Sequence, residues 1–360
     1  MKIIFIVPSI SDSHYRNRIV EFIENGYSVD VYGFERKNIN KKPVLPYSVN
    51  VIGSIEDESY IERVKLYIKE FRKLGKRFNQ KDDIFYLCGL DIAIFFHYVN
   101  PKFQYLYEEC DLTHTYTKIK KLLEFIDLRI IKTSLLTILT SEGFINYHFN
   151  GEKPHNVCLV ENKLNPAIVE YTVSKRKPLD RNSISIGFVG GPRFDSVFNF
   201  IDVYCRTFPQ HTFHIFGGPV PKQFETLRKY KNCIFHGFFT NPNDLPEIYS
   251  KIDLVLSTYD TKYENVRFAE PNKIYECLYF EAPIIVSSNT FLAEKVNRLG
   301  IGYDIDAMDD NAIIEFVNRL SQEEVKKKSD NAHLIDKKET ININTKLFDK
   351  LKSVIHSCQK

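Results

Sequence analysis

Short aliphatic segments alternate with amphipathic helical segments along this chain, and the alternation restricts the fold more than any other feature of the sequence. KIIFIVP (2–8) precedes a helical pattern in YRNRIVEFIENGY (15–27). Further strand-like segments of the first half are SVDVYGF (28–34), DDIFYLCG (82–89), FQYLYEECD (103–111), LLTILTS (135–141) and NVCLVEN (156–162). Apolar residues on both faces of such segments indicate parallel strands that helices cover on both sides. The first half therefore predicts a doubly wound α/β domain.

The second half repeats this alternation. Its strand-like segments are SISIGFVGG (183–191), HTFHIFGG (211–218), NCIFHGFF (232–239), DLVLSTYD (253–260) and PIIVSS (283–288). We expect a Rossmann-like domain at 1–165, a polar linker at 166–183, a second Rossmann-like domain at 184–340, and an amphipathic helix in 341–360 that packs back toward the N-terminal domain. Ligands bind outside the carboxyl ends of open parallel sheets, so two such domains facing a central cleft would accommodate two substrates.

The composition excludes several classes of protein. The formal net charge of the 360 residues is only +3, which gives no support for nucleic acid as a partner. The seven cysteines are scattered without a CxxC pair, which argues against a disulfide framework or a structural zinc site and favours a reducing cytoplasm. The first apolar segment ends at Pro8, too early for a signal peptide, and no run reaches about 18 apolar residues, so we expect no membrane span.

The segment EPNKIYECLYFEAP (270–283) combines a helical pattern with closely spaced charges. Pro271 suits the first helical position, and the helix is expected over about 272–280. Lys273 and Glu276 are three residues apart, so they share a helix face in the first turn, where the helix dipole favours an anion. Lys273 could hold a diphosphate, and Glu276 could accept hydrogen bonds from ribose hydroxyls. The alternative is a solvated ion pair on a surface helix.

This segment resembles the donor-binding signature of the retaining glycosyltransferases of family 4 (glycosyl transferases group 1), which have the GT-B fold. In that signature PNK, two further residues and Glu precede a strand that begins Pro-Ile/Val-Val. The resemblance covers residues 184–305, whereas the first half is similar mainly in its α/β pattern. It implies a hexosyltransferase-type enzyme that moves a sugar from a nucleotide-diphosphate sugar to a hydroxyl of a growing glycan, with retention and without a metal or other cofactor.

The resemblance also implies the partners and the setting. UDP is favoured over GDP as the donor nucleotide, and the acceptor is a glycan or a lipid-linked glycan. The implied setting is bacterial surface polysaccharide assembly, such as capsule, in the cytoplasm or at the inner face of the cytoplasmic membrane. The donor-binding residues that it suggests are Gly190, Gly191, Arg193, Asn272, Lys273 and Glu276.

The sequence departs from the family pattern at three places. Phe268 occupies the position of the first of two family glutamates, so Asn265, Arg267 or Glu270 would have to hold the donor sugar. Glu281 occupies a position that is often Gly, and a left-handed turn there would cost on the order of 1 kcal/mol. The loop GGPRFDS (190–196) offers only Arg193, so we expect Arg193 and Lys273 to share the diphosphate.

The first half offers weaker candidates for the acceptor side. The loop PSISDSHYRNR (8–18) places His14, Arg16 and Arg18 after the first strand, and we expect His14 to be catalytic and the two arginines to bind acceptor. Asp111 ends a predicted strand and is a second catalytic candidate. The alternatives are a polar loop for the first group and a helix N-cap for Asp111. We interpret His97 and His148 as ordinary helix or loop histidines, and no metal-ligand cluster is evident.

The segment IERVKLYIKEFRKLGKRF (61–78) predicts a basic amphipathic helix. Such a helix can lie on anionic lipid, which would give a peripheral membrane contact. The alternative is a helix that packs on the core and exposes a solvated basic face. Two other functions stay open: a sugar-nucleotide epimerase of the same fold, and a non-catalytic partner subunit that binds sugar nucleotide.

Overall fold

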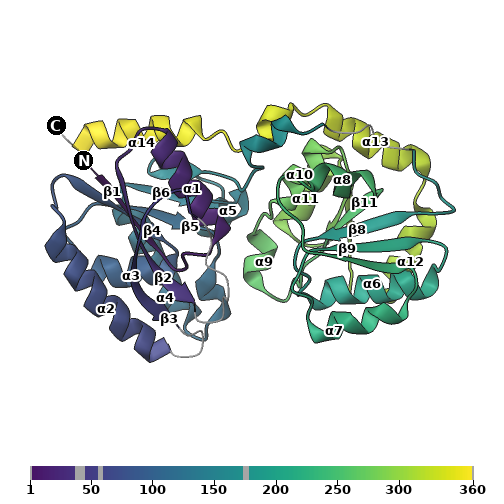
Figure 1. Ribbon diagram of the computed structural model, residues 1–360, viewed down its shortest axis with the longest axis horizontal. Helices are drawn as coiled ribbons and strands as arrows, with labels where there is room; N and C mark the ends of the chain where they lie inside the picture. The colour runs from purple at the N-terminus through teal and green to yellow at the C-terminus, as the bar shows by residue number, and fades with distance from the viewer. Residues whose placement is uncertain (1, 37–44, 56–59, 173–177, 359–360) are drawn as a thin grey trace. The chain divides into compact units, whose positions relative to one another are not determined.

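The computed structural model describes residues 2–36, 45–55, 60–172 and 178–358 and divides the chain into two compact units (Figure 1). The first unit is 1–160 with 344–360, and the second is 161–343. The chain therefore first passes from one unit to the other between Val160 and Glu161, and not between residues 165 and 166 as predicted. The difference has a physical reason, because Leu164 and Ile168 are buried in the core of the second unit. Residues 173–177 of the predicted linker lie outside the described residues.

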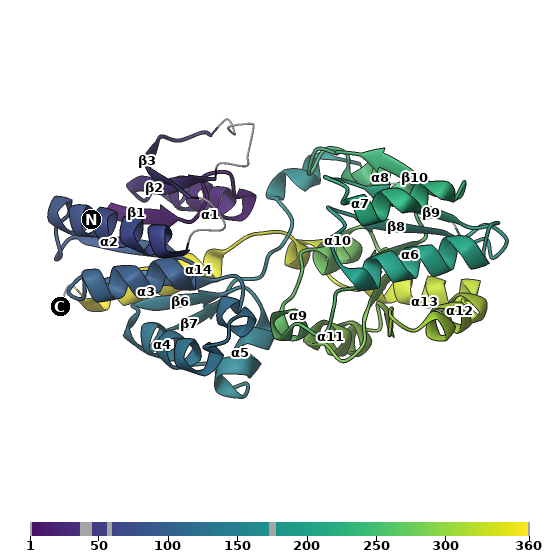
Figure 2. The same ribbon diagram turned by 90° about the horizontal axis from the view of Figure 1, so that it is seen from below.

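The first unit contains a parallel sheet of seven strands in the order β3-β2-β1-β4-β5-β6-β7. Its strands are β1 (Lys2–Val7), β2 (Val29–Arg36), β3 (Val49–Ile55), β4 (Asp83–Cys88), β5 (Tyr105–Glu109), β6 (Leu136–Leu139) and β7 (Val157–Leu159). Its helices are α1 (Ser13–Glu24), α2 (Tyr60–Arg77), α3 (Leu90–Val99), α4 (Lys120–Thr133), α5 (Glu142–Phe149) and α14 (Thr345–Cys358), with a 3₁₀ turn, η1, at Thr113–Tyr116. Helices cover both faces of the sheet (Figure 2), so the doubly wound prediction is confirmed.

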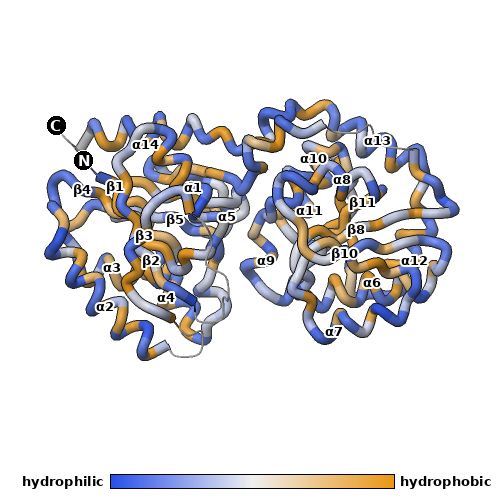
Figure 3. The backbone as a smooth tube through the Cα atoms, viewed as in Figure 1, coloured by the Kyte–Doolittle hydropathy of each residue, from blue (hydrophilic) through white to orange (hydrophobic). Residues whose placement is uncertain are grey.

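The second unit contains a parallel sheet of six strands in the order β10-β9-β8-β11-β12-β13. Its strands are β8 (Ser185–Val189), β9 (Thr212–Phe216), β10 (Cys233–Gly237), β11 (Leu254–Ser257), β12 (Ile284–Ser287) and β13 (Gly302–Ile305). Its helices are α6 (Asp195–Thr207), α7 (Lys222–Glu225), α8 (Leu245–Ser250), α9 (Glu264–Phe268), α10 (Lys273–Tyr279), α11 (Phe291–Leu299), α12 (Asp310–Arg319) and α13 (Gln322–His333), with 3₁₀ turns η2 (Pro166–Glu170), η3 (Thr226–Lys229) and η4 (Lys337–Thr340). Hydrophobic segments follow the strands of both sheets (Figure 3).

Helix α2 packs its apolar stripe on the core of its own unit. The Tyr67 ring lies 5.0 Å from the Phe34 ring, and the Phe71 ring lies 5.7 Å from the Phe96 ring. The core-facing alternative for residues 61–78 is therefore confirmed, and this stripe is not available to enter a lipid surface. Among the residues that the structure describes, no helix combines the length and the apolar character needed to cross a membrane.

The C-terminal helix α14 belongs to the first unit and completes its core. Phe348 is only 4% exposed, and its ring lies 5.1 Å from that of Phe22 on α1. Leu347 and Leu351 are buried in the same cluster. The end of the chain therefore stabilises a unit that is otherwise built from its beginning.

We expect Phe348→Ala to lower the free energy of unfolding of the first unit by about 3–5 kcal/mol, because the change leaves a cavity beside Phe22. Hydrogen exchange of the β1 and β4 amides measures this loss without reporting on the second unit. Lys352→Ala, an exposed position on the same helix, should change exchange by no more than about 0.5 kcal/mol. Equal effects of the two variants would show that α14 does not pack as described.

Candidate functional site

Each sheet reverses its strand order once, and these two switch points are where ligands bind in open α/β sheets. In the second unit the reversal lies between β8 and β11. The loop after β8 holds Gly190 and Gly191, and the segment after β11 leads through α9 to Lys273. Several predicted donor-binding residues therefore lie on the segments that follow two neighbouring strands, β8 and β11.

The two glycines after β8 have different surroundings. Gly190 has a φ of +138° and donates its N–H to the Phe216 carbonyl at 2.7 Å. Its positive φ is a conformation that residues with a side chain rarely adopt, although a Cβ there would come no closer than 3.9 Å to another residue. Gly191 is exposed. Gly190 is thus required by the chain itself, whereas Gly191 leaves backbone open to a ligand.

Two exposed arginines lie on these segments. The Arg193 guanidinium carbon lies 5.0 Å from the centre of the Phe194 ring, and the side chain is exposed. Arg267 is exposed in the last turn of α9. Among the described residues neither arginine takes part in an ion pair of 4.0 Å or less. Their positive charges are therefore available to an anion.

Helix α10 begins at Lys273, with Asn272 as its N-cap, so Pro271 is not at the first helical position as predicted. The predicted shared face of Lys273 and Glu276 is confirmed, because Lys273 Nζ lies 2.8 and 2.7 Å from the two Glu276 carboxylate oxygens. The side chains are only 12% and 1% exposed. The pair is thus a buried ion pair, and the solvated surface alternative is wrong.

The Glu276 carboxylate is fully engaged within the protein. The Tyr249 hydroxyl donates to Oε2 at 2.7 Å, and Asn272 Nδ2 lies 3.4 Å from Oε1. Together with the two bonds from Lys273 these contacts use the four lone-pair sites of a carboxylate. An ammonium has three donors, so Lys273 keeps one N–H for a further oxygen. In this conformation Lys273, rather than Glu276, is equipped to contact a ligand.

Glu270 belongs to a second buried network rather than to an open pocket. Its carboxylate oxygens lie 2.9 and 2.8 Å from Lys295 Nζ, and it accepts a hydrogen bond from the Tyr275 hydroxyl. Lys295 also contacts Glu161 at 3.0 Å. Burial raises the pKa of Glu270 although Lys295 opposes the shift. A contact of Glu270 with a donor sugar stays a prediction, and its visible role is to hold α10 against α11.

The neighbouring departures from the family pattern also have defined places. Phe268 ends α9 and is half-buried, and Asn265 on the same helix is only 5% exposed. Glu281 has a φ of 56°, so the backbone does make a left-handed turn there. This strained backbone conformation of a non-glycine residue occurs in the connection between α10 and β12.

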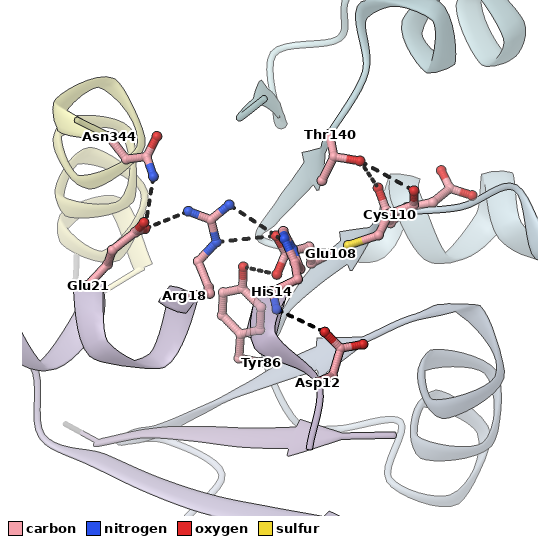
Figure 4. A network of polar contacts seen from close by, with 10 residues as sticks. Asp12, His14, Arg18, Glu21, Tyr86, Glu108, Cys110, Thr140 and Asn344 are labelled. Carbon is pink, nitrogen blue, oxygen red and sulfur yellow. Dashed lines mark hydrogen bonds and ion pairs between the residues drawn. The ribbon is translucent and has the colours of Figure 1, made fainter. Parts of the chain in front are cut away.

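In the first unit several polar side chains contact one carboxylate, that of Glu108 on β5 (Figure 4). His14 Nε2 lies 3.0 Å from Oε1, and Arg18 reaches the same oxygen from Nε at 3.2 Å and from Nη2 at 3.1 Å. The Tyr86 hydroxyl donates to Oε2 at 2.8 Å. Asp12 caps α1 by accepting from the His14 N–H at 2.9 Å. Sequence reasoning missed Glu108, although an acid inside an apolar strand signals a buried charge.

This network fixes the charges of its members. Burial favours the neutral form of Glu108, but Arg18 and His14 outweigh it and lower its pKa to about 2. Burial likewise opposes a charged His14, yet its acidic surroundings at Cys110 and Glu108 raise its pKa well above the usual value. His14 is 25% exposed. The His14 ring is therefore partly exposed and, when protonated, can donate a hydrogen bond to an anion. It can act as a base only in its neutral form, which dominates above the raised pKa.

The remaining acceptor-side candidates lie at different depths. Arg18 is 3% exposed and bound to Glu108 and Glu21, so it orients Glu108, and a direct contact with an acceptor stays a prediction. Arg16 is half-buried. Asp111 is exposed, but β5 ends at Glu109 and the N-cap of η1 is Leu112. The prediction that Asp111 ends the strand is therefore wrong, and the acids at that end are Glu108 and Glu109.

Comparison with known proteins supports the architecture. No protein-family model matches the chain. The structure of Anabaena Alr3699/HepE in complex with UDP and glucose matches with a TM-score of 0.71 at 15% identity, over 98% of this chain and 100% of that one. Sucrose-phosphate synthase (tll1590) from Thermosynechococcus elongatus matches with a TM-score of 0.70 at 14% identity, over 98% and 100%. The chain has the GT-B fold.

A distant curated relative points in the same direction. The succinoglycan biosynthesis protein ExoL of Rhizobium meliloti (strain 1021) is 21% identical over 352 residues, which cover 89% of this chain and 85% of ExoL. The similarity thus extends over both units of the GT-B fold. It does not by itself assign the chain to family 4.

We expect Lys273→Met to lower the free energy of unfolding of the second unit by about 3–5 kcal/mol, because it leaves the Glu276 carboxylate buried and unpaired. The double variant Lys273→Met/Glu276→Gln should recover part of this loss. Urea unfolding monitored by hydrogen exchange of β11 and β12 measures both. Lys251→Met removes an exposed partner of Glu247 and should cost about 0–1 kcal/mol. A cost for Lys273→Met as small as this control would contradict the buried pair.

The charge of His14 should depend on Glu108. In the wild type the imidazole should titrate above its usual pKa of about 6.5, whereas in Glu108→Gln the pKa of His14 should be lower than in the wild type, because one of the two neighbours that oppose the effect of burial is lost. The stability that charged His14 provides is present below about pH 6.5 and is lost as the pH rises through its raised folded pKa. NMR titration of the His14 ring measures the shift.

The matched control is Glu24→Gln, which removes an exposed carboxylate from the same helix α1. It should leave the His14 titration unchanged. An unchanged titration in Glu108→Gln as well would mean that Glu108 does not hold the imidazolium.

Proposed function

We propose that this protein is a glycosyltransferase that moves a sugar from a nucleotide-diphosphate sugar, UDP-linked in preference to GDP-linked, to a hydroxyl of a growing glycan. The observation that carries the proposal is the match over both Rossmann-like units to HepE, which has been solved with UDP and with UDP-glucose. The similarity to ExoL, named for succinoglycan biosynthesis, supports polysaccharide assembly as the setting.

The donor belongs at the switch point of the second unit in this proposal. Arg193 and the remaining N–H of Lys273 would hold the diphosphate, with backbone supplied by Gly191. Positive charge placed there stabilises the negative charge that develops on the leaving nucleotide, and it is preorganised because Lys273 is fixed by Glu276. Exposed Arg267 is the best-placed remaining candidate for the donor sugar. The proposed transfer retains configuration and draws this charge from side chains rather than from a metal.

The acceptor belongs to the first unit. Half-open His14 would donate to an acceptor oxygen or phosphate. Half-buried Arg16 lies two residues further along α1, so it points to a different side of the helix. Arg18 would act through Glu108 by keeping it ionised. His14 is therefore proposed as an electrostatic group in the transfer and not as a base at neutral pH.

A lipid-linked acceptor would bring the protein to the inner face of the cytoplasmic membrane. The apolar stripe of α2 is buried, so a membrane contact through this helix would be electrostatic. The exposed basic residues on α2 are Lys65, Lys69, Arg72, Lys73, Lys76 and Arg77. The contact is part of the proposal only for a lipid-linked acceptor, such as one used in capsule assembly.

Calorimetric titration with UDP, GDP, CMP and NAD is the first test. We expect UDP to bind, and Arg193→Ala to weaken it about tenfold, or about 1.4 kcal/mol, because a phosphate contact is lost. Binding of uridine, which has no phosphate, should not change in this variant. Arg319→Ala, which removes an exposed arginine from α12, should bind UDP as the wild type does. Absence of binding to any nucleoside diphosphate would overturn the proposal.

Turnover then separates the alternatives. A glycosyltransferase releases UDP in proportion to a glycosylated product, and NMR of that product gives the anomeric configuration. An epimerase would change the free UDP-sugar without an acceptor. A non-catalytic subunit, which the Phe268 position keeps open, would bind UDP and convert no UDP-sugar in either assay.

A further inference from the structure

Strand β5 ends in two consecutive acids, Glu108 and Glu109, whose side chains have different surroundings. Successive side chains of a strand point to opposite faces of the sheet, so Glu108 and Glu109 diverge. Glu108 meets the cations of α1, as described above. Glu109 faces α4 and α5, where it meets Asp127 on α4, His148 on α5 and His114 in η1. We call these four residues, Glu109, His114, Asp127 and His148, the β5 cluster.

The β5 cluster is closed and compact. All four side chains are 0% exposed. His148 Nε2 lies 2.9 Å from Glu109 Oε2 and 3.9 Å from Asp127 Oδ2, and His114 Nδ1 lies 3.4 Å from Asp127 Oδ2. One ligand atom from each of Glu109, His114 and Asp127 lies within 4.8 Å of the other two. Ligand atoms about 2.0–2.1 Å from a tetrahedral ion are separated by about 3.3 Å, a value that the separations among Glu109, His114 and Asp127 allow. The His114 and His148 rings lie 6.1 Å apart, so His148 would have to move closer to act as the fourth ligand.

The cluster leaves an unusual number of buried polar atoms without hydrogen-bond partners in the part of the chain that the structure describes. They are Glu109 Oε1, both Asp127 oxygens, His114 Nδ1 and His148 Nδ1. Buried carboxylate oxygens without a donor are costly unless the group gains a proton or a cation. Among the residues that the structure describes, no lysine or arginine forms an ion pair with this cluster.

We propose that the β5 cluster binds one divalent transition-metal ion, for which Zn²⁺ is the best match. Two imidazoles and two carboxylates are ligands that Zn²⁺ accepts in a tetrahedral site, and the two carboxylates balance its charge. Coordination by His114 Nδ1 requires its proton on Nε2, where the Tyr147 hydroxyl oxygen lies 3.3 Å away and can accept it. Such a partner on the other ring nitrogen is the usual way in which a ligating histidine is oriented.

The site is structural rather than catalytic because it is closed to solvent. Its ligands come from a strand end, a 3₁₀ turn and two helices, so the ion would cross-link the 110–119 connection to the sheet. That connection begins at Cys110, whose carbonyl is otherwise tied to the sheet by a 3.4 Å contact from Thr140 Oγ1 (Figure 4). The sequence concealed this site because its ligands are 5 to 39 positions apart, with no metal-binding spacing.

The test is metal analysis of the full chain, purified on a resin without chelating groups. We expect about one zinc per chain in the wild type by plasma mass spectrometry. The zinc content per chain of the double variant Asp127→Asn/His148→Gln should be at least tenfold lower. His333→Gln, which changes a 72% exposed histidine, should keep it. Zinc that persists in the double variant would overturn the proposal.

A second measurement does not depend on variants that could fail to fold. The wild type is stripped with chelator and loaded with Co²⁺, and the visible absorption of tetrahedral Co²⁺ is expected, with a higher Tm than the stripped protein. No Co²⁺ or Zn²⁺ uptake and an unchanged Tm would mean that the carboxyl groups hold protons instead, and the proposal would be wrong. Loss of the metal in His14→Gln/Cys110→Ser but not in Asp127→Asn/His148→Gln would place the ion at His14, Glu108 and Cys110 and would also overturn it.

Discussion

Parallel pairing of every strand in both sheets is the constraint on which the rest of this structure depends. It sends all strand carboxyl ends to one edge of each sheet, and the single reversal of strand order opens that edge between two neighbouring strands. The loop after β8 and the segment after β11 leave the second sheet at its reversal, as the loop after β1 leaves the first. The positions of Arg193, Lys273 and His14 are thus consequences of topology before they are consequences of any side-chain contact.

Charges buried near these edges are balanced in different ways. Glu276 is neutralised by Lys273, and Glu108 by Arg18 together with His14. The cations lower the pKa of Glu108, and Lys273 lies within hydrogen-bond distance of Glu276. Lys273 and His14 are more exposed than the acids that they contact. This arrangement suits recognition of anions, which is what a nucleotide diphosphate and a phosphate-linked acceptor would present.

Much of the fold could be predicted because the strands of a doubly wound sheet are continuous apolar runs. The edge strand β3 could not, since VNVIGSI is interrupted by Asn50, Gly53 and Ser54. For the site, the spacing of Lys273 and Glu276 predicted their contact, but not that Tyr249 and the packing around α10 would bury the pair. Local sequence gives helix spacing; it does not give burial, which depends on segments distant in the chain. The same limit hid the partners of Glu108 and the histidines around Glu109.

The proposed metal ion is compatible with a transfer reaction that uses only side-chain charges, because Glu108 and Glu109 at the end of β5 have different surroundings. A closed ion at Glu109 would lie on the opposite face of the sheet from Glu108 and His14, so it could not contact a substrate that reaches His14. Its effect would be mechanical, because it would tie the end of β5 to η1, α4 and α5. Fixing Glu109 fixes the backbone of Glu108, and through it the orientation of the His14 imidazolium. The proposed ion at Glu109 would thus stabilise the backbone, while the neighbouring Glu108 would position His14, the group that contacts the ligand.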